Sequence, residues 1–158
     1  MILYHGSNCD IESIDLNMCR PYKDFGKSFY LTTILSQARE MSQKVADRFG
    51  GTPIVNVFDF DDTDLSSLTI KKFEKPDREW AEFVMANRSR DQSHPADDYD
   101  LIIGPVANDD IATLFRTFAI KVITIDELVQ GLKSRKLNNQ YAFRTPKAIS
   151  FLRKRPCI

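Results

Sequence analysis

Short runs of apolar residues, several of which alternate with polar ones, predict strands at six places along the chain. These predicted strands are residues 2–5, 28–33, 53–60, 68–73, 100–106 and 140–143. Val122-Ile123 is predicted as a shorter extended piece. Residues 8–27, between the first two strands, have no clear periodicity, and a loop of that length in a compact domain is usually functional or covers something.

Other segments carry apolar residues at helical spacing or begin with a helix cap. They are residues 34–49, which end at Gly50-Gly51; a helix capped by Asp77 that contains Trp80; residues 111–118; a helix opened by the capping box of Thr124 and Glu127; and a last helix from Pro146 to Leu152. Strands scattered between helices, without regular βαβ alternation, favour an α+β fold.

Length and composition are those of one soluble domain. The 158 residues are 42% hydrophobic and include 11 Phe, 5 Tyr and 1 Trp, enough for a core, so we predict a single domain over 1–158. No apolar run approaches the roughly 20 residues that span a bilayer, and no secretory leader pattern is present, so we expect a cytoplasmic protein without a membrane partner. Three scattered cysteines, Cys9, Cys19 and Cys157, have neither disulfide-framework nor zinc-site spacing and are predicted to be reduced.

The net charge of zero hides a strong asymmetry between the two ends. Residues 133–158 carry +8 with no acid, and residues 1–132 therefore carry −8. The basic residues are Lys133, Arg135, Lys136, Arg144, Lys147, Arg153, Lys154 and Arg155. Such a region either attracts an anionic partner, such as a phosphate-bearing cofactor, a nucleic acid or an acidic protein, or forms a solvated basic surface balanced by the acidic body.

Two short motifs carry the candidate chemistry. In the first, Tyr4-His5-Gly6-Ser7, a strand delivers an imidazole to its end and then turns through glycine, which suits a hydrogen-bond donor beside a closely approaching ligand. In the second, the turn Gly26-Lys27 precedes an alternating run that carries Tyr30. Together they suggest a pocket for a flat ring and a sugar.

These motifs resemble the ADP-ribosyltransferase superfamily, on the side of diphtheria toxin and the poly(ADP-ribose) polymerases. The likeness extends over nearly the whole chain through Trp80-Ala81-Glu82-Phe83-Val84 and Tyr99-Asp100-Leu101-Ile102-Ile103-Gly104-Pro105. The chain looks most like a bacterial family of unknown function, grouped with those transferases, whose members are possible toxins. The resemblance implies a split β-sheet core with flanking helices and a site on three strands.

The resemblance also implies the ligand and the residue roles. NAD would be the substrate, held by His5, Gly6, Ser7, Tyr30 and Met41, and the catalytic residues would be His5, Tyr30 and Gln140. Tyr30 is suited to stack on the cationic nicotinamide, a contact worth on the order of 0.5–2 kcal/mol. His5 would bond a ribose hydroxyl, and the backbone of Gly6 would meet the carboxamide.

Two positions depart from the family pattern. Gln140 stands where a catalytic glutamate is usual; its amide can bond the ribose 2′-hydroxyl but carries no charge and cannot act as a general base. Met41 stands where many relatives place a second aromatic ring. Glu79 and Glu82 are candidates for the missing acid, although solvated helix charges are the plainer interpretation.

The leading hypothesis is therefore an NAD-dependent mono-ADP-ribosyltransferase whose acceptor is a macromolecule, a protein rather than a nucleic acid. A bacterial toxin would also have an antitoxin partner. The alternative is a noncatalytic NAD-binding or protein-interaction module of the same fold. Arg88 is predicted to be either a pyrophosphate ligand or an exposed helix end, and His94, without metal-ligand partners at useful spacing, receives no role.

Overall fold

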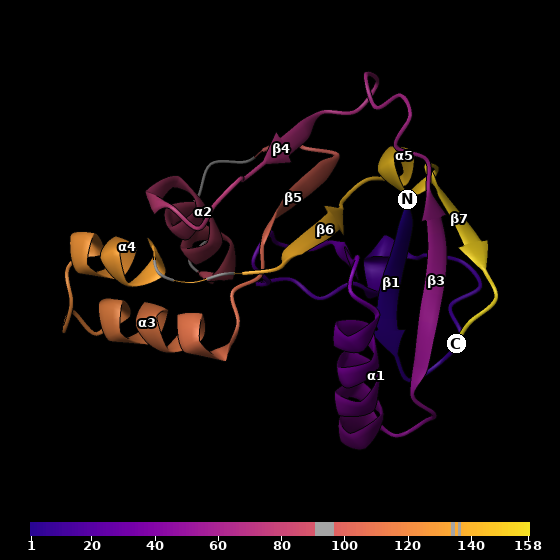
Figure 1. Ribbon diagram of the computed structural model, residues 1–158, viewed down its shortest axis with the longest axis horizontal. Coiled ribbons are helices and arrows are strands. Elements are labelled where there is room, and N and C mark those ends of the chain that lie inside the picture. Colours follow the sequence, from indigo (N-terminus) through magenta and orange to yellow (C-terminus); the bar gives the residue numbers. More distant parts are fainter. Residues whose placement is uncertain (91–96, 134, 136) are drawn as a thin grey trace.

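The computed structural model describes residues 1–90, 97–133, 135 and 137–158 (Figure 1). Its strands are β1 (Ile2–Ser7), β2 (Phe29–Thr32), β3 (Ile54–Phe60), β4 (Ile70–Lys72), β5 (Leu101–Pro105), β6 (Asn139–Phe143) and β7 (Leu152–Arg155). Its helices are α1 (Leu35–Phe49), α2 (Arg78–Arg88), α3 (Asp109–Ala119), α4 (Ile125–Lys133) and α5 (Pro146–Ile149), with a short 3-10 turn, η1 (Leu16–Met18).

The strands form one mixed sheet in the order β4-β5-β6-β2-β1-β3-β7. Only the β4–β5 pair is parallel, and the other neighbours run antiparallel. Helices α2, α3 and α4 gather at the β4–β5 end, whereas α1 lies against β1 (Figure 1). The predicted α+β class is therefore confirmed.

The helix boundaries follow the capping signals in the sequence. The Asp77 carboxylate accepts a hydrogen bond from the backbone nitrogen of Trp80 at 3.1 Å, at the first turn of α2. Thr124 and Glu127 form a reciprocal capping box at the start of α4, as predicted. These caps satisfy backbone donors that the first turn of each helix leaves without intrahelical partners.

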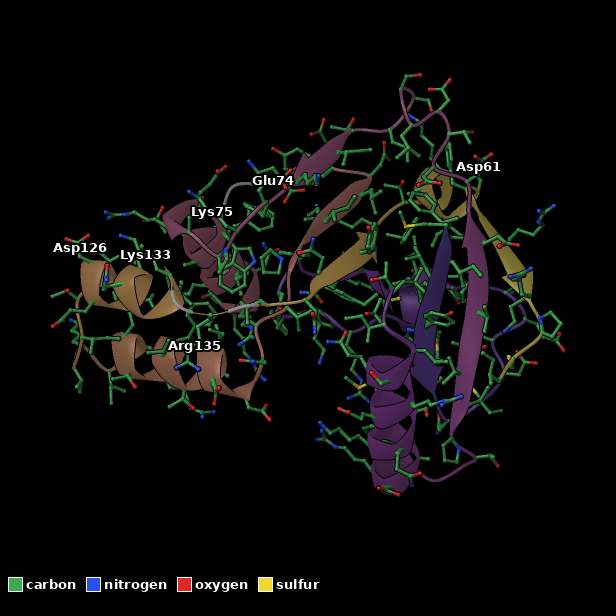
Figure 2. All side chains as sticks on the ribbon, in the orientation of Figure 1. Asp61, Glu74, Lys75, Asp126, Lys133 and Arg135 are labelled. Atoms are coloured by element: carbon green, nitrogen blue, oxygen red, sulfur yellow. The ribbon has the colours of Figure 1, made fainter. Side chains whose placement is uncertain are left out.

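Apolar side chains form a core on each face of the sheet. One face of β5 and β6 packs with α2, α3 and α4 around the fully buried Trp80. The opposite face carries Leu3, Phe29 and Phe143 in a second cluster, against which residues 11–19 of the long loop pack. Charged side chains such as Glu74 and Asp126 lie at the periphery (Figure 2). Because successive side chains of a strand point to opposite faces of the sheet, each strand contributes alternate residues to the two cores.

Two predicted elements are wrong. Val122-Ile123 is a turn between α3 and α4, not a strand, because Lys121 adopts a φ of 60° and reverses the chain. The last helix ends at Ile149, so Leu152 belongs to β7 and pairs with Phe60. The helical spacing of Ala148, Phe151 and Leu152 reflects only neighbouring residues. Pairing of Leu152 with β3, a contact with a distant part of the chain, decides its structure instead.

No helix within the described ranges is both long enough and apolar enough to cross a membrane. His94 lies outside those ranges, as does Lys136.

Candidate functional site

The sheet is weakly joined between β1 and β2. These strands share a single paired position, Tyr4 with Thr32, whereas β1 pairs with β3 at six positions and β2 pairs with β6 at four. The rest of β2 makes no ladder pair with β1 in the described structure. We call this place the β1–β2 junction; it divides the sheet into β4-β5-β6-β2 and β1-β3-β7.

His5 bridges the β1–β2 junction with its side chain. Its Nδ1 lies 2.8 Å from the carbonyl oxygen of Tyr30. Because a carbonyl oxygen only accepts, Nδ1 carries the hydrogen and the neutral ring presents Nε2 as an acceptor. Burial lowers the pKa of His5, the Tyr30 carbonyl opposes that shift, and the charge of Lys154 adds to the lowering. His5 is thus expected to be neutral at pH 7 and to accept, rather than donate, a further hydrogen bond.

Strand alternation decides which predicted site residues face one another. The ring of His5 stacks on Phe29, with centroids 4.5 Å apart, so it lies on the Phe29 face of the sheet. Tyr30 and Gln140 lie on the opposite face, because neighbouring strand residues alternate and Tyr30 is paired with Ala142, two residues from Gln140. The structure therefore brings Tyr30 and Gln140 to one face and places the His5 ring on the other.

Gly6 also lies on the face of Tyr30 and Gln140, directly beneath α1. A Cβ atom at Gly6 would stand 2.1 Å from the Ala38 carbonyl oxygen and 3.0 Å from the Cβ of Met41. Because Gly6 has no side chain, the backbone of α1 can lie close to β1. The sequence predicted that a ligand, rather than a helix, would approach Gly6 closely. Met41 is part of α1 and is therefore close to Gly6, with about half of its surface exposed. Ser7 is buried on the His5 face.

Tyr30 has no free hydroxyl. Its oxygen donates a hydrogen bond to the Gly26 carbonyl at 2.8 Å and accepts one from the backbone nitrogen of Phe25 at 2.9 Å. Burial, the largest effect, raises the pKa of Tyr30, so the hydroxyl stays protonated. The hydroxyl holds the turn of residues 25–30, and only the ring of Tyr30 remains for a ligand.

Gln140 is anchored by a buried acid that sequence reasoning did not assign a role. Its Nε2 donates to Asp24 Oδ2 at 2.8 Å and faces the Pro105 carbonyl at 3.4 Å. Arg88 donates to Asp24 Oδ1 from Nε at 2.9 Å and from Nη2 at 2.6 Å, and the backbone nitrogen of Ala107 donates to Oδ2. The Oε1 of Gln140 remains as an acceptor.

This Asp24–Arg88–Gln140 cluster corrects one of the two predictions for Arg88. The residue is not an exposed helix end, because its Nε and Nη2 form a partly buried ion pair with Asp24. Its role as a pyrophosphate ligand stays a prediction. The only sequence signal was the position of Asp24 before Gly26, a turn glycine with φ of 75°. That glycine is packed against Asn87, where a Cβ atom would stand 2.8 Å from Oδ1, so the turn and the end of α2 fit together.

The cluster predicts a pH-dependent effect for Gln140→Glu. The introduced carboxyl would lie beside the Asp24 carboxylate, so its pKa is expected to rise above its unfolded value. The protonated form can still donate to Asp24, whereas the ionised form repels it. We expect the variant to lose about 1–3 kcal/mol of stability at pH 8 and much less at pH 5, because a raised folded-state pKa favours the fold only at low pH.

Urea unfolding of the wild type and the variant at both pH values measures this difference. Gln43→Glu is the matched control, since Gln43 also donates to an aspartate, Asp47, at 2.7 Å, but on the exposed surface of α1. Its cost is expected to stay below about 0.5 kcal/mol at either pH. Equal losses for Gln140→Glu at pH 5 and pH 8 would contradict the geometry.

The two competing acids are solvated helix charges. Glu79 forms an ion pair with Lys71, and Glu82 forms one with Arg78, one turn earlier in α2. Both carboxylates are exposed, with side-chain exposures of 65% and 56%. Neither contacts Gln140 or Asp24, so the structure gives no support to their replacing the missing glutamate.

Much of the basic C-terminal region is paired with the acidic body of the protein. Five of its cations form ion pairs with aspartates from earlier in the chain: Arg135 with Asp110, Arg144 with Asp97, Lys147 with Asp100, Lys154 with Asp10, and Arg155 with Asp59. Hydrogen bonds from Thr145 and Thr69 and the nearby Lys147 lower the pKa of Asp100, which keeps it ionised. This pairing favours the balanced-surface interpretation over a nucleic-acid surface.

The cysteines lie free in the described structure, with Cys9 exposed. Burial, the largest effect, raises the pKa of Cys157, although Lys154 Nζ lies 3.1 Å from its sulfur. Within the described ranges, no three side chains of His, Cys, Asp or Glu gather where they could hold a metal ion.

Comparison with known proteins places this geometry in a family without an assigned activity. Searches of curated proteins and of solved structures find no match. A family model described as "Protein of unknown function (DUF3990)" matches residues 1–153, which include the β1–β2 junction and the Asp24–Arg88–Gln140 cluster. Because that match covers nearly the whole chain, the protein belongs to the DUF3990 family.

Proposed function

We propose that the protein is an NAD-dependent mono-ADP-ribosyltransferase with a split-sheet core. It would cleave the bond between nicotinamide and ribose and pass ADP-ribose to a macromolecular acceptor, a protein rather than a nucleic acid. As a bacterial toxin it would be neutralised by an antitoxin protein. The observation that carries the proposal is the β1–β2 junction, where the strands part and His5 bonds across to Tyr30.

The face opposite the His5 ring supplies a set of groups suited to nicotinamide. Tyr30 offers an aromatic ring whose hydroxyl is already occupied, and Met41 offers an adaptable apolar side chain. Gln140 retains Oε1, which can accept a hydrogen bond from the ribose 2′-hydroxyl. A cationic nicotinamide ring and its ribose fit this chemistry.

The reaction needs no protein nucleophile. Loss of neutral nicotinamide takes the bonding electron pair with it and leaves an oxocarbenium-like ribose, which an acceptor hydroxyl, carboxylate or amine then attacks. Fixed geometry and a polar environment supply much of such a rate. The His5 ring lies on the opposite face, so its role would be to position: its Nδ1 bond to the Tyr30 carbonyl would hold β1 against β2 where the strands part. The acceptor's proton would leave to solvent, because Gln140 cannot take it.

The experiment is incubation of the purified protein with NAD, with nicotinamide release followed by chromatography. We expect release by the wild type and a fall of about tenfold or more in His5→Ala, which removes the hydrogen bond to Tyr30 across the β1–β2 junction. Tyr30→Phe keeps the ring and is expected to retain most of the activity of the folded protein. Gln43→Ala, an exposed change on α1, is the control that should leave release unchanged.

A noncatalytic NAD-binding or protein-interaction module is the second candidate. Two observations favour it: the amide of Gln140 is anchored to Asp24, and the His5 ring lies on the opposite face from Tyr30 and Gln140. Saturable binding of intact NAD by calorimetry, without nicotinamide release, would select NAD binding over catalysis. If the folded protein neither binds nor cleaves NAD, the transferase and NAD-binding hypotheses both fail.

A further inference from the structure

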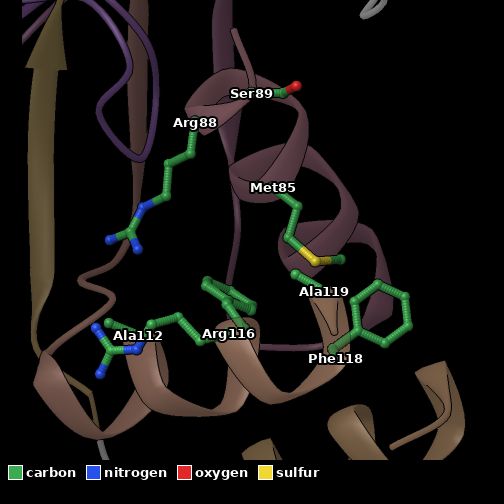
Figure 3. A pocket seen from close by; sticks show the side chains of 8 residues that line it. Met85, Arg88, Ser89, Ala112, Arg116, Phe118 and Ala119 are labelled. Carbon is green, nitrogen blue, oxygen red and sulfur yellow. The ribbon is translucent and has the colours of Figure 1, made fainter. Parts of the chain in front are cut away.

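A surface groove of about 440 Å³ lies between α2 and α3 (Figure 3). Its lining includes Met85, Arg88, Ala112, Phe115, Arg116 and Phe118. We call it the α2–α3 groove. Its volume falls within the range of roughly 300–1,000 Å³ that is typical of pockets for small ligands. The residues proposed to hold NAD do not line it, so an inference about this groove is independent of that function.

One end of the α2–α3 groove is positively charged. The guanidinium groups of Arg88 and Arg116 lie together at this end (Figure 3). The charge of Arg88 is balanced by Asp24, at 2.6 Å. The guanidinium of Arg116 donates to the hydroxyl of Thr113, at 3.0 Å, and within the described residues no carboxylate pairs with it. Arg116 therefore supplies a positive charge without an ion-pair partner there.

The remainder of the groove is mostly apolar and aromatic. Phe115 is 7% exposed, and the guanidinium of Arg88 lies 5.6 Å from its ring centroid. Met85 and Phe118 line the end away from the two guanidinium groups (Figure 3). Ala112, a small residue, leaves open the space beside Arg116. A ligand with separate apolar and anionic parts matches this division.

We propose that the α2–α3 groove binds a small molecule that carries a flat apolar ring and an anionic group, such as an aromatic carboxylate or sulfonate. The ring would pack against Phe115, Met85 and Phe118, where it removes apolar surface from water. The anion would lie at Arg116, whose guanidinium makes charge-assisted hydrogen bonds with planar or tetrahedral anions. Arg88, held by Asp24, would fix the position of the charged end.

Two fluorescent probes test this proposal because they differ only in the anion. 1-Anilinonaphthalene-8-sulfonate carries the ring system and a sulfonate, and N-phenyl-1-naphthylamine carries the same rings without it. We expect saturable binding of the sulfonate at one site, and a loss of about tenfold in its affinity for Arg116→Gln. Binding of the neutral probe should be weaker and should not respond to this change. Ala112→Leu, which fills the groove, should weaken both probes.

Arg39→Gln is the matched control, because Arg39 is an exposed arginine on α1, away from the groove. It should leave both affinities unchanged, and circular dichroism checks that each variant remains folded. The proposal is overturned if the sulfonate does not bind saturably, or if Ala112→Leu and Arg116→Gln leave its affinity unchanged. Equal affinities for the two probes would also overturn it, since the anion would then contribute nothing.

Discussion

Replacing Gly6 with alanine is expected to destabilise the protein by about 3 kcal/mol or more. The added Cβ atom would stand 2.1 Å from the carbonyl oxygen of Ala38 and 2.6 Å from the backbone nitrogen of Ser42. Both are backbone atoms of α1, so no rotation of a side chain relieves the overlap. The helix must move away from β1, which loosens the small core of Ala38, Val55 and Val57 against which Tyr4 packs.

Urea unfolding measures this loss as a lower midpoint. Gly131→Ala is the control, because Gly131 lies inside α4, where a Cβ atom would meet only Leu114 side-chain atoms at 3.4 Å. Alanine favours helix, so this variant is expected to gain about 0.5–1 kcal/mol. If Gly6→Ala is as stable as the wild type, then α1 does not lie on β1 as described.

Replacing Asp24 with asparagine is expected to cost about 3 kcal/mol. Asp24 is 7% exposed and accepts hydrogen bonds from Arg88, Ala107 and Gln140. Asparagine has the same shape, but its amide has one acceptor oxygen and turns an NH2 group towards one set of these donors. The guanidinium of Arg88, about a third exposed, is then left partly buried without its anion.

A double-mutant cycle with Arg88→Met separates this ion pair from general packing. The double variant is expected to lose less than the sum of the single losses, because methionine leaves no unpaired charge. Asp59→Asn, which removes an exposed pair with Arg155 on the edge strand, is the control and should cost less than about 1 kcal/mol. Additive losses at Asp24 and Arg88 would mean that the pair does not contribute as a unit.

Local patterns predicted most elements because their information is local. The spacing over 34–49, the cap at Asp77 and the Thr124 capping box place α1, α2 and α4 within a residue or two. Helical spacing places Leu152 in the last helix, which is wrong because its strand depends on pairing with Phe60, far away in the sequence. The sequence therefore predicts the α+β class of the fold, but it does not predict the order of the strands in the sheet.

The same difference between local and long-range information applies to the candidate site. His5 and Tyr30 were found from neighbouring residues, a glycine after one and a Gly-Lys turn before the other. The sequence does not indicate that Asp24 pairs with Arg88, because 64 positions separate them and the turn glycine beside Asp24 does not point to α2. The separation of His5 from Tyr30 by strand alternation required the register of three strands. A single sequence does not show which residues that are far apart along the chain pair with one another.

The place of β6 and β7 in the sheet has a consequence for the protein while it is being synthesised. β6 lies between β5 and β2, and β7 pairs with β3 beside β1, so each part of the sheet needs a strand from residues 139–155. Neither part is complete until those residues have left the ribosome. Folding is therefore expected to finish only after translation of this segment, and the nascent chain carries unpaired strand edges until then.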